Sequence, residues 1–491
     1  MRFSISPLIC RLLIAIVVLL PAAPVLALNT DLPDLGNSAG SLMTPKREQE
    51  LGQAFMRNVR RTQNVMDDPL LADYIQSLGT RLARNSTSSG TPFSFFLIDS
   101  PQINAFAGPA GHIGVYTGLL LTTETESELA AVLAHEIAHV TQQHLLRTWE
   151  STSQMGIPRA AMLIAAVVLG AAVGGDAAAA AAIGSQAAML QQRINFTRAN
   201  EKEADRVGIE ILAKSEFEPR AMPTFFSRMG RANRVYATQL PEYLMTHPVT
   251  DSRTADSLGR ADQFAYRQSV DSLRYQLARV NLMQRRIDQP EDAIRELTLM
   301  LEDGRFRSEA ATRYGIALAQ VRAKRFDEAV ESLDYLLKQH PDSLEFTISR
   351  ADADRARGRY SDALRRLRDS LEAHPASYAV NLAYAETALD ANQPKLALNA
   401  LRRFLDYRDD EPRIYRLLSR AAGNLGQEAL GHEYLAEHYY LRGQTKLAAL
   451  QIETALKQPK LDFFDASRLE ARLAALNAEL DEEDQRPTPV R

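Results

Sequence analysis

Two histidines stand four residues apart in the stretch LAAVLAHEIAHVTQQHLL, residues 129–146. On a helix, His135 and His139 would lie one turn apart on the same face, so both imidazoles could bind one metal ion. Glu136 would lie close enough to act on a metal-bound water. This H-E-x-x-H arrangement is typical of zinc metalloproteases. The alternative is a helix whose histidines are merely packed or solvated.

The surrounding residues predict the helix that would carry these histidines. No Gly or Pro interrupts residues 126–154, and apolar side chains recur at helical spacing. The motif is not extended as in the metzincins, in which a Gly and a third His follow H-E-x-x-H, because Gln142 and Leu145 stand at those two positions. His144 would face the opposite side of a continuous helix from His135, so we expect it at the surface.

A third ligand must come from elsewhere, and the best candidate segment is NEKEADRVGIEIL, residues 200–212. Glu201 and Asp205 share a helix face at i, i+4. Glu201 would complete a His, His, Glu site of the thermolysin kind. Asp205 could accept the second ring N–H of a zinc-bound histidine and so fix its tautomer. Spacing alone favours Glu201 only slightly over Glu203, and an ordinary salt-bridged helix face is the alternative.

Together these motifs resemble the peptidase family of HtpX and the CAAX prenyl proteases. HEIAHV and NEKEADRVG are accompanied by INAFAGPAGHIGVYTGLL before them and THPVTDSR after them, and the likeness covers about residues 51–263. The resemblance implies one Zn²⁺ per chain, with Glu201 as third ligand and Asp205 behind the ligands. It also implies that a peptide substrate lies along an exposed strand near residues 104–115, where strand addition would supply main-chain hydrogen bonds.

The same resemblance places the His-Pro segment beside the metal. Zinc proteases usually need a second cation or donor for the developing oxyanion, and His247 and Arg253 are the candidates. His247 could instead be a turn residue before Pro248. Its ring would either take the open metal position at rest or stand back and donate to the oxyanion. We favour the resting ligand, because an exported protease needs restraint against indiscriminate cleavage.

The N-terminus predicts export. Residues 1–27 combine a basic start, an apolar run over residues 12–20 and a small-residue cleavage site ending at Ala27, as in a signal peptide. We therefore expect a periplasmic protein. Its only cysteine, Cys10, lies in that segment, so the mature chain would have no disulfide. Residues 28–45 read as an extended leader.

Composition and patterning predict a mainly α fold. The formal net charge is −4 and no basic cluster occurs, which argues against nucleic-acid binding. Residues 46–265 would form the metalloprotease domain, with two helices over residues 46–82 and a small sheet from residues 93–98 and 103–120. The Ala/Gly-rich residues 160–190 read as two small helices near the site. A mobile cover over the metal and a membrane contact are the alternatives there.

Residues 266–480 carry repeats with a period of 34 residues, which is the tetratricopeptide period. Three series show it, and each has one member in each of three successive repeats. They are Ala317, Ala351 and Ala385; Ala329, Ala363 and Ala397; and Leu333, Leu367 and Leu401. Such an array usually offers a concave face to a peptide or protein partner. Residues 481–491 would be a disordered tail.

With its export signal and repeats, the chain resembles periplasmic family members that act in outer-membrane β-barrel protein assembly and quality control. The resemblance implies an endopeptidase that degrades misfolded or stalled outer-membrane proteins, has a chaperone-like role, and contacts the assembly machinery through its repeats. The other class is a non-proteolytic chaperone or scaffold with a structural zinc. Glu136 favours the enzyme, because a structural site needs no general base. We also expect each module to have its own apolar core, so that a cut near Arg267 leaves a soluble zinc-binding domain.

Overall fold

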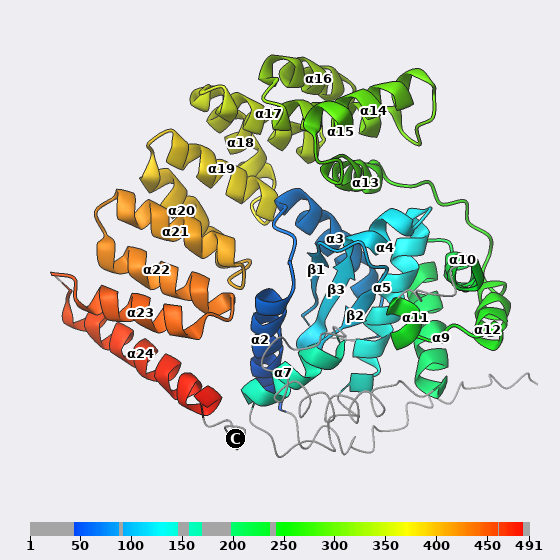
Figure 1. The fold of residues 1–491 in the computed structure, drawn as a ribbon, viewed down its shortest axis with the longest axis horizontal. Helices are drawn as coiled ribbons and strands as arrows, with labels where there is room; N and C mark the ends of the chain where they lie inside the picture. The colour runs from blue at the N-terminus through cyan, green and yellow to red at the C-terminus, as the bar shows by residue number, and fades with distance from the viewer. Residues whose placement is uncertain are drawn as a thin grey trace, which may run out of the picture. The chain divides into compact units, whose positions relative to one another are not determined.

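The computed structural model describes residues 44–87, 92–145, 157–168, 198–235, 242–459 and 461–484. The predicted signal peptide, most of the leader and most of residues 160–190 lie outside these ranges. Residues 43–491 form one compact unit. Its described part is mainly helical with one small sheet, which confirms the fold class expected from the sequence (Figure 1).

The sheet has three strands: β1 (Ser94–Ile98), β2 (Ala105–Ala107) and β3 (His112–Tyr116). The order is β1-β3-β2, with β1 parallel and β2 antiparallel to the central β3. A short 3₁₀ turn, Pro109–Gly111, joins β2 to β3, and the positive φ of Gly111 suits a residue without a Cβ. The strands lie within residues 93–98 and 103–120, where the sequence predicted the sheet, and β2 is an edge strand.

Nine described helices surround this sheet in the first half of the chain, and the central one is α5. They are α2 (Pro45–Thr62), α3 (Pro69–Ala83), α4 (Thr117–Thr122), α5 (Glu126–Thr141), α7 (Ile157–Val168), α9 (Arg198–Lys214), α10 (Ala221–Val235), α11 (Glu242–Thr246) and α12 (Asp251–Ala261). Local sequence explains several of their starts. Helices α2 and α3 begin at a proline, and the side chains of Thr44 and Asp68 cap their first turns.

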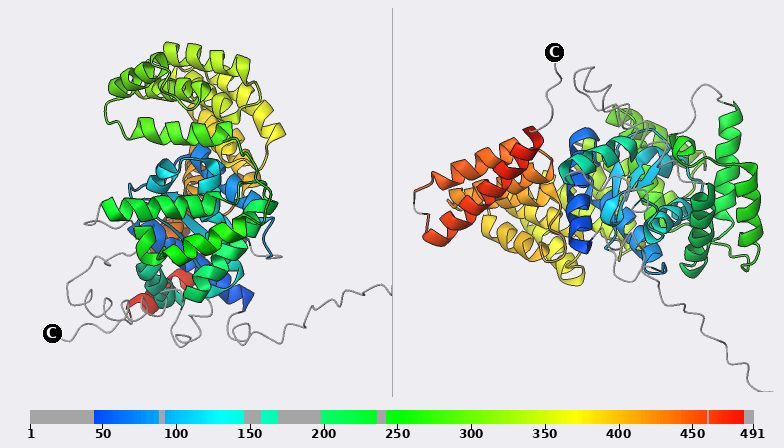
Figure 2. Two further views of the ribbon diagram at one scale, coloured as in Figure 1. Left: turned by 90° about the vertical axis from the view of Figure 1, so that its right-hand side faces the viewer. Right: turned by 90° about the horizontal axis from the view of Figure 1, so that it is seen from below.

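The second half is a series of paired helices that stack in chain order (Figures 1 and 2). They are α13 (Leu273–Arg285), α14 (Pro290–Glu302), α15 (Glu309–Arg322), α16 (Phe326–Gln339), α17 (Leu344–Ala356), α18 (Tyr360–Ala373), α19 (Tyr378–Asp390), α20 (Pro394–Phe404), α21 (Pro412–Asn424), α22 (Glu428–Leu441), α23 (Thr445–Leu456) and α24 (Phe463–Asp484). All nine residues of the three 34-residue series are fully buried. The six alanines let paired helices approach closely, and the three leucines fill the space between them. The start of the predicted tail is wrong, because α24 continues to Asp484.

Apolar clusters of their own lie within the repeats, but the two halves also share one cluster where they meet. Tyr275, Ala278 and Leu282 of α13 are buried in the same apolar cluster as the residues of α5. Further along the repeats, Asp73 of α3 accepts hydrogen bonds from the Ser377 hydroxyl at 2.6 Å and from two backbone N–H groups at the start of α19. A cut near Arg267 would therefore expose part of the core and remove a helix-capping contact.

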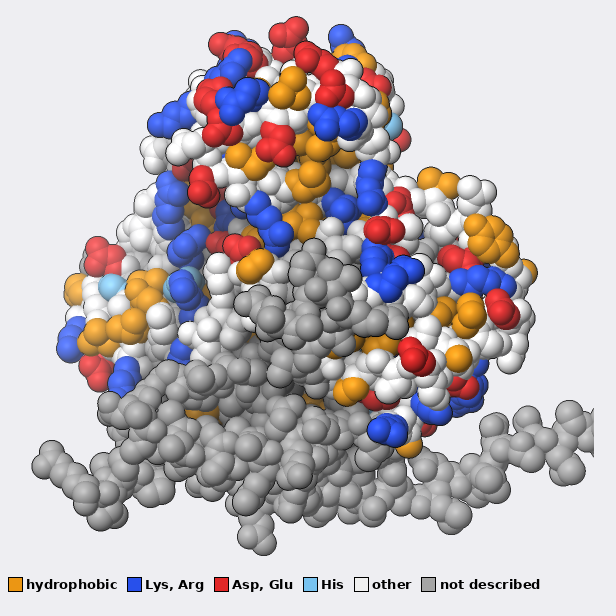
Figure 3. All heavy atoms as spheres, turned by 45° about the vertical axis from the view of Figure 1, so that its right-hand side comes forward, with side chains coloured by type: hydrophobic (Ala, Val, Ile, Leu, Met, Phe, Trp, Pro, Cys, Tyr) orange, Lys and Arg blue, Asp and Glu red, His pale blue; other side chains and the backbone are white. Residues whose placement is uncertain are grey.

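The described surface carries both signs of charge. Figure 3 shows Lys and Arg side chains interspersed with Asp and Glu, with apolar side chains scattered between them. In the described part of the chain, no helix has both the length and the apolar character needed to cross a bilayer.

Candidate metal centre

Helix α5 carries the first two candidate ligands and is buried along almost its whole length. Thr125 caps its first turn by accepting a hydrogen bond from the backbone N–H of Glu128. His135 and His139 lie one turn apart, with their Nε2 atoms separated by 3.0 Å. The two residues are 0 % and 2 % exposed, which excludes the interpretation that they are solvated.

Helix α9 brings the third candidate ligand against α5. Oxygens of the Glu201 carboxylate lie 3.5 Å from Nε2 of His135 and 3.4 Å from Nε2 of His139. The two helices approach closely at Gly208, where an added Cβ would lie 3.2 Å from the backbone nitrogen of His135 and 2.9 Å from the Met222 methyl carbon. This glycine therefore sets the distance that lets Glu201 reach the histidines.

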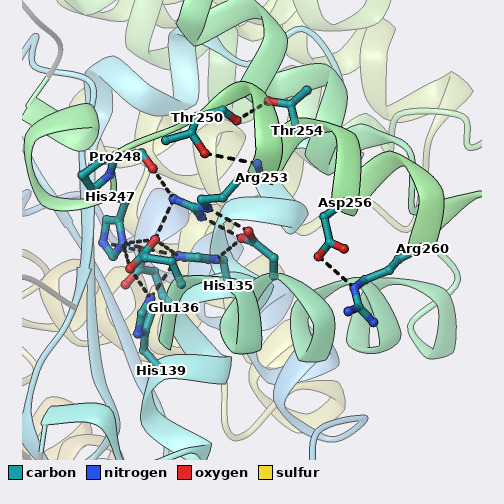
Figure 4. Close-up of polar contacts among 12 residues, drawn as sticks. His135, Glu136, His139, His247, Pro248, Thr250, Arg253, Thr254, Asp256 and Arg260 are labelled. Atoms are coloured by element: carbon teal, nitrogen blue, oxygen red, sulfur yellow. Dashed lines mark hydrogen bonds and ion pairs between the residues drawn. The ribbon is translucent and has the colours of Figure 1, made fainter. Parts of the chain in front are cut away.

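His247 is the fourth member of the cluster. It follows the short helix α11, and its backbone N–H donates to the Tyr243 carbonyl at 2.8 Å. Its Nδ1 lies 3.1 Å from a Glu201 oxygen and 3.3 Å from Nε2 of His135. The Tyr243 ring packs beside the imidazole, with centroids 5.0 Å apart. Figure 4 shows His135, His139 and His247 turned toward one another, each from a different turn or segment.

The spacing of these atoms fits a bound metal ion. One ligand atom from each of His135, His139, Glu201 and His247 lies within 4.8 Å of the other three. The separations of His135 and Glu201 from each other and from His139 and His247 run from 3.0 to 3.5 Å. Zinc bonds of about 2.0–2.1 Å in tetrahedral geometry require ligand atoms roughly 3.3 Å apart. Three imidazoles and a carboxylate thus form a donor set suited to one divalent metal ion.

Asp205 and Arg253 support the ligands from behind. Asp205 Oδ1 lies 3.0 Å from Nδ1 of His135, which leaves Nε2 of that ring for the metal. Arg253 donates to both Asp205 oxygens at 2.8 and 2.9 Å, and its other nitrogen lies 2.8 Å from Glu201. Burial opposes ionisation of Asp205, but hydrogen bonds from His135 and Arg253 outweigh it and lower the Asp205 pKa. The Arg253 guanidinium therefore has the contacts of a group that fixes two carboxylates.

Glu136 lies beside the cluster without belonging to it. It is 1 % exposed, and its Oε1 is 3.5 Å from Nε2 of His247. Burial raises the pKa of its carboxyl, while the neighbouring His247 and His135 and a hydrogen bond from the Ala107 backbone act in the lowering direction. A buried carboxylate with a raised pKa, next to a metal site, is suited to accept and return a proton.

His144 was predicted at the surface, and this prediction is wrong. Helix α5 ends at Thr141, and Gln143 adopts a left-handed conformation with φ of 55°. The chain therefore turns back, and His144 is fully buried with its Nδ1 2.8 Å from Nδ1 of His139. The apolar periodicity of residues 129–146 did not reveal this helix end, because no Gly or Pro marks it.

Two sequence families match the chain. The pattern of Peptidase family M48 matches residues 69–261, and that of the tetratricopeptide repeat matches residues 354–421. These matches fall on the segment that holds all of the candidate ligands and on helices α17 to α21 of the repeat array.

Two bacterial relatives match nearly the whole chain, and a mitochondrial one matches less than half of it. The beta-barrel assembly-enhancing protease of Yersinia pestis is 33 % identical over 91 % of both chains. The protein of the same name from Escherichia coli K12 is 35 % identical over 94 % of this chain and 95 % of its own. The mitochondrial metalloendopeptidase OMA1 of Danio rerio is 29 % identical over 45 % of this chain and 48 % of its own. Among solved structures, a tetratricopeptide repeat protein from Parabacteroides merdae is 12 % identical with a TM-score of 0.28, over 51 % of this chain and 98 % of its own.

Proposed function

Because this chain belongs to the family of the beta-barrel assembly-enhancing proteases, within the M48 metallopeptidases, we propose that it is a zinc-dependent endopeptidase of the bacterial periplasm that acts on outer-membrane β-barrel proteins. Its ligands would be His135, His139 and Glu201, with Asp205 fixing His135. The observation that supports this most is Glu136, a buried carboxylate within 3.5 Å of the ligand cluster. A scaffold with a structural zinc would have no use for such a group.

The chain's own residues supply the proton transfers. When bound, zinc would polarise the scissile carbonyl and make the attacking water more acidic. Glu136 would take the proton of that water and return it to the leaving amine. Arg253 would hold Glu201 and Asp205 in their ionised forms, so that both keep a fixed orientation during turnover.

The substrate would bind along the sheet edge next to Glu136. Strand β2 lies at the edge of the sheet, and the backbone of its last residue, Ala107, hydrogen-bonds to Glu136. An extended peptide added beside β2 would bring its main chain to the same side of the sheet as the base. This mode recognises backbone rather than sequence, which suits a protease acting on unfolded β-rich substrates.

His247 would be a ligand in the resting enzyme. Its Nδ1 is as close to Glu201 and His135 as those residues are to each other. If the ring blocks the fourth position, His247→Ala should increase casein cleavage and self-cleavage. If it donates to the oxyanion, the rate should fall on the order of 10²–10³-fold. Wild-type cleavage in both assays would leave His247 as a turn residue only.

The cellular role follows from the relatives' names and from the repeats. The enzyme would degrade misfolded or stalled outer-membrane β-barrel proteins, assist others to mature in a chaperone-like role, and contact the assembly machinery through its tetratricopeptide repeats. Export by a signal peptide cleaved near Ala27 would place it in the periplasm.

Metal analysis and casein digestion test the enzymatic part. The purified protein should contain one zinc per chain, lose casein cleavage with a chelator, and regain it when zinc is restored. Full-length Glu136→Gln protein in a periplasmic extract should then co-purify with outer-membrane β-barrel proteins. Cleavage that survives complete zinc removal would contradict the proposal.

A further inference from the structure

We infer that His144 and Glu203 are positioning residues that hold His139 in the tautomer whose Nε2 lone pair faces the metal, an inference that rests on the proposed metal site. His144 lies outside the H-E-x-x-H motif, and Glu203 lies between Glu201 and Asp205 on α9. Neither is in the ligand cluster.

His139, His144 and Glu203 form a series of hydrogen bonds that ends at a carboxylate. Nδ1 of His139 lies 2.8 Å from Nδ1 of His144, with the two rings at 71° to each other. Nε2 of His144 lies 3.3 Å from Oε2 of Glu203. Both imidazoles are buried, whereas the Glu203 side chain keeps 36 % exposure at the edge of the site.

Among these contacts, one arrangement of protons satisfies each hydrogen bond and leaves a ligand lone pair on His139. The Glu203 carboxylate can only accept, so Nε2 of His144 carries a proton and donates it. Nδ1 of the neutral His144 then accepts from the Nδ1–H of His139. Nε2 of His139 consequently has no proton and can bind a metal.

Glu203 determines which nitrogen of each histidine carries the proton in this series of hydrogen bonds. Without an acceptor at its far end, neutral His144 could carry its proton on Nδ1. Nδ1 of His139 would then have to accept, and its Nε2–H would point at Nε2 of His135, only 3.0 Å away. That arrangement removes the lone pair that the metal needs.

The two ligand histidines are thus oriented by different means. Nδ1 of His135 meets a carboxylate of α9 directly, at 3.0 Å from Asp205. His139 lies one turn closer to the end of α5, and its Nδ1 is linked to the α9 carboxylate of Glu203 through His144. The left-handed turn at Gln143 places His144 beside His139, and Leu145 packs against the apolar cluster of α2 and α7.

Zinc affinity measured on full-length protein tests the inference. We would use the Glu136→Gln background to prevent self-cleavage and determine the zinc Kd by competition with a chromophoric chelator. His144→Leu removes the acceptor, and loss of an outer-shell partner weakens metal binding about 10–100-fold. His144→Asn should bind within a few-fold of the parent, because its Oδ1 can accept in place of Nδ1.

Variants of Glu203 test the other end of this series of hydrogen bonds. Glu203→Leu should weaken zinc binding, and Glu203→Gln less so, because its amide oxygen still accepts. Lys202→Leu, at the exposed neighbouring position on α9, is the matched control and should bind zinc like the parent.

Unfolding midpoints with and without zinc separate positioning from a purely structural role. His144→Leu should reduce the increase in midpoint that zinc produces. If His144→Leu lowers both midpoints equally and leaves the zinc Kd unchanged, the inference is overturned. Parent-like zinc Kd values for both His144→Leu and Glu203→Leu would also overturn it. If His144→Leu does not fold, a parent-like Kd for Glu203→Leu overturns it alone. If the parent itself binds no zinc, the proposed function fails instead.

Discussion

The metal centre buries mainly charged and polar side chains, whereas the repeat array buries mainly apolar ones. In the centre, Glu136, Glu201 and Asp205 are 1–2 % exposed and lie against three histidines and one arginine. In the array, the buried positions are mostly Ala and Leu. Ion pairs such as Arg468–Glu433 remain partly exposed, and Arg350–Asp354 is a buried exception. The centre is therefore held by mutually dependent charges, and the array by repeated apolar contacts between neighbouring helices.

This difference determines what a substitution can do. Removing one partner of a buried charged group leaves another without compensation, which is costly. A change in one repeat acts mainly on the adjoining repeats, because each contacts chiefly its neighbours. Variants in the centre should therefore change metal binding or rate, and variants in the array should change stability at constant metal content.

The largest expected effect comes from Glu136→Gln. The amide keeps the shape of the side chain but cannot accept the proton of the attacking water. Casein cleavage should fall on the order of 10²–10⁴-fold, the usual contribution of a general base. Zinc content and unfolding midpoint should stay close to those of the parent. More than a few per cent of residual cleavage would exclude Glu136 as the base.

Glu201→Ala should lower zinc affinity as well as activity. It removes a ligand and leaves Arg253 and the histidines without their shared carboxylate. The loss of affinity should exceed the 10–100-fold typical of an outer-shell residue. Glu210→Ala on the same helix, outside the cluster, is the control. Stoichiometric zinc bound as tightly as in the parent would move the third ligand to another residue.

Leu367→Ala should show the opposite behaviour. Leu367 is fully buried in the array, so the substitution should lower the free energy of unfolding by about 2–5 kcal/mol. Zinc affinity should be unchanged while the protein is folded. Leu450→Ala, at a 51 % exposed position, is the matched control. Denaturant unfolding with parallel zinc titration checks both, and a weaker zinc Kd for Leu367→Ala would contradict the separation of the two regions.

The smallest effect concerns Asp352 of the array. Burial raises its pKa from 3.8 to about 6, although the nearby Arg355 opposes the shift. The folded state then holds the proton more tightly than the unfolded chain, so this carboxyl costs stability as pH rises from about 4 to 6. The side chain keeps 38 % exposure, so we expect an effect below about 1 kcal/mol.

Asp352→Asn removes this pH dependence. The difference in free energy of unfolding between the variant and the parent should be more favourable to the variant at pH 7 than at pH 4. Asp327→Asn, with an 87 % exposed side chain, is the matched control. Denaturant unfolding at the two pH values measures the difference. An equal change in stability at both values would show that folding does not shift the Asp352 pKa.

Local patterns were sufficient for much of this molecule. Two histidines at i, i+4 share a helix face whatever surrounds them, so His135 and His139 could be paired from their spacing. The 34-residue period likewise predicted the buried positions of the repeats, because each repeat packs on its neighbours through equivalent residues. The two helices over residues 46–82 and the strands within residues 93–98 and 103–120 were also predicted from the sequence.

Long-range packing supplied the rest. Glu201 and His247 lie far along the chain from His135, and only the close approach of α9 at Gly208 and the turn after α11 bring them together. The burial of His144 depends on a helix end that no Gly or Pro marks. The core shared by α5 and α13 likewise could not be read from either segment, because an apolar helix face does not specify which partner covers it.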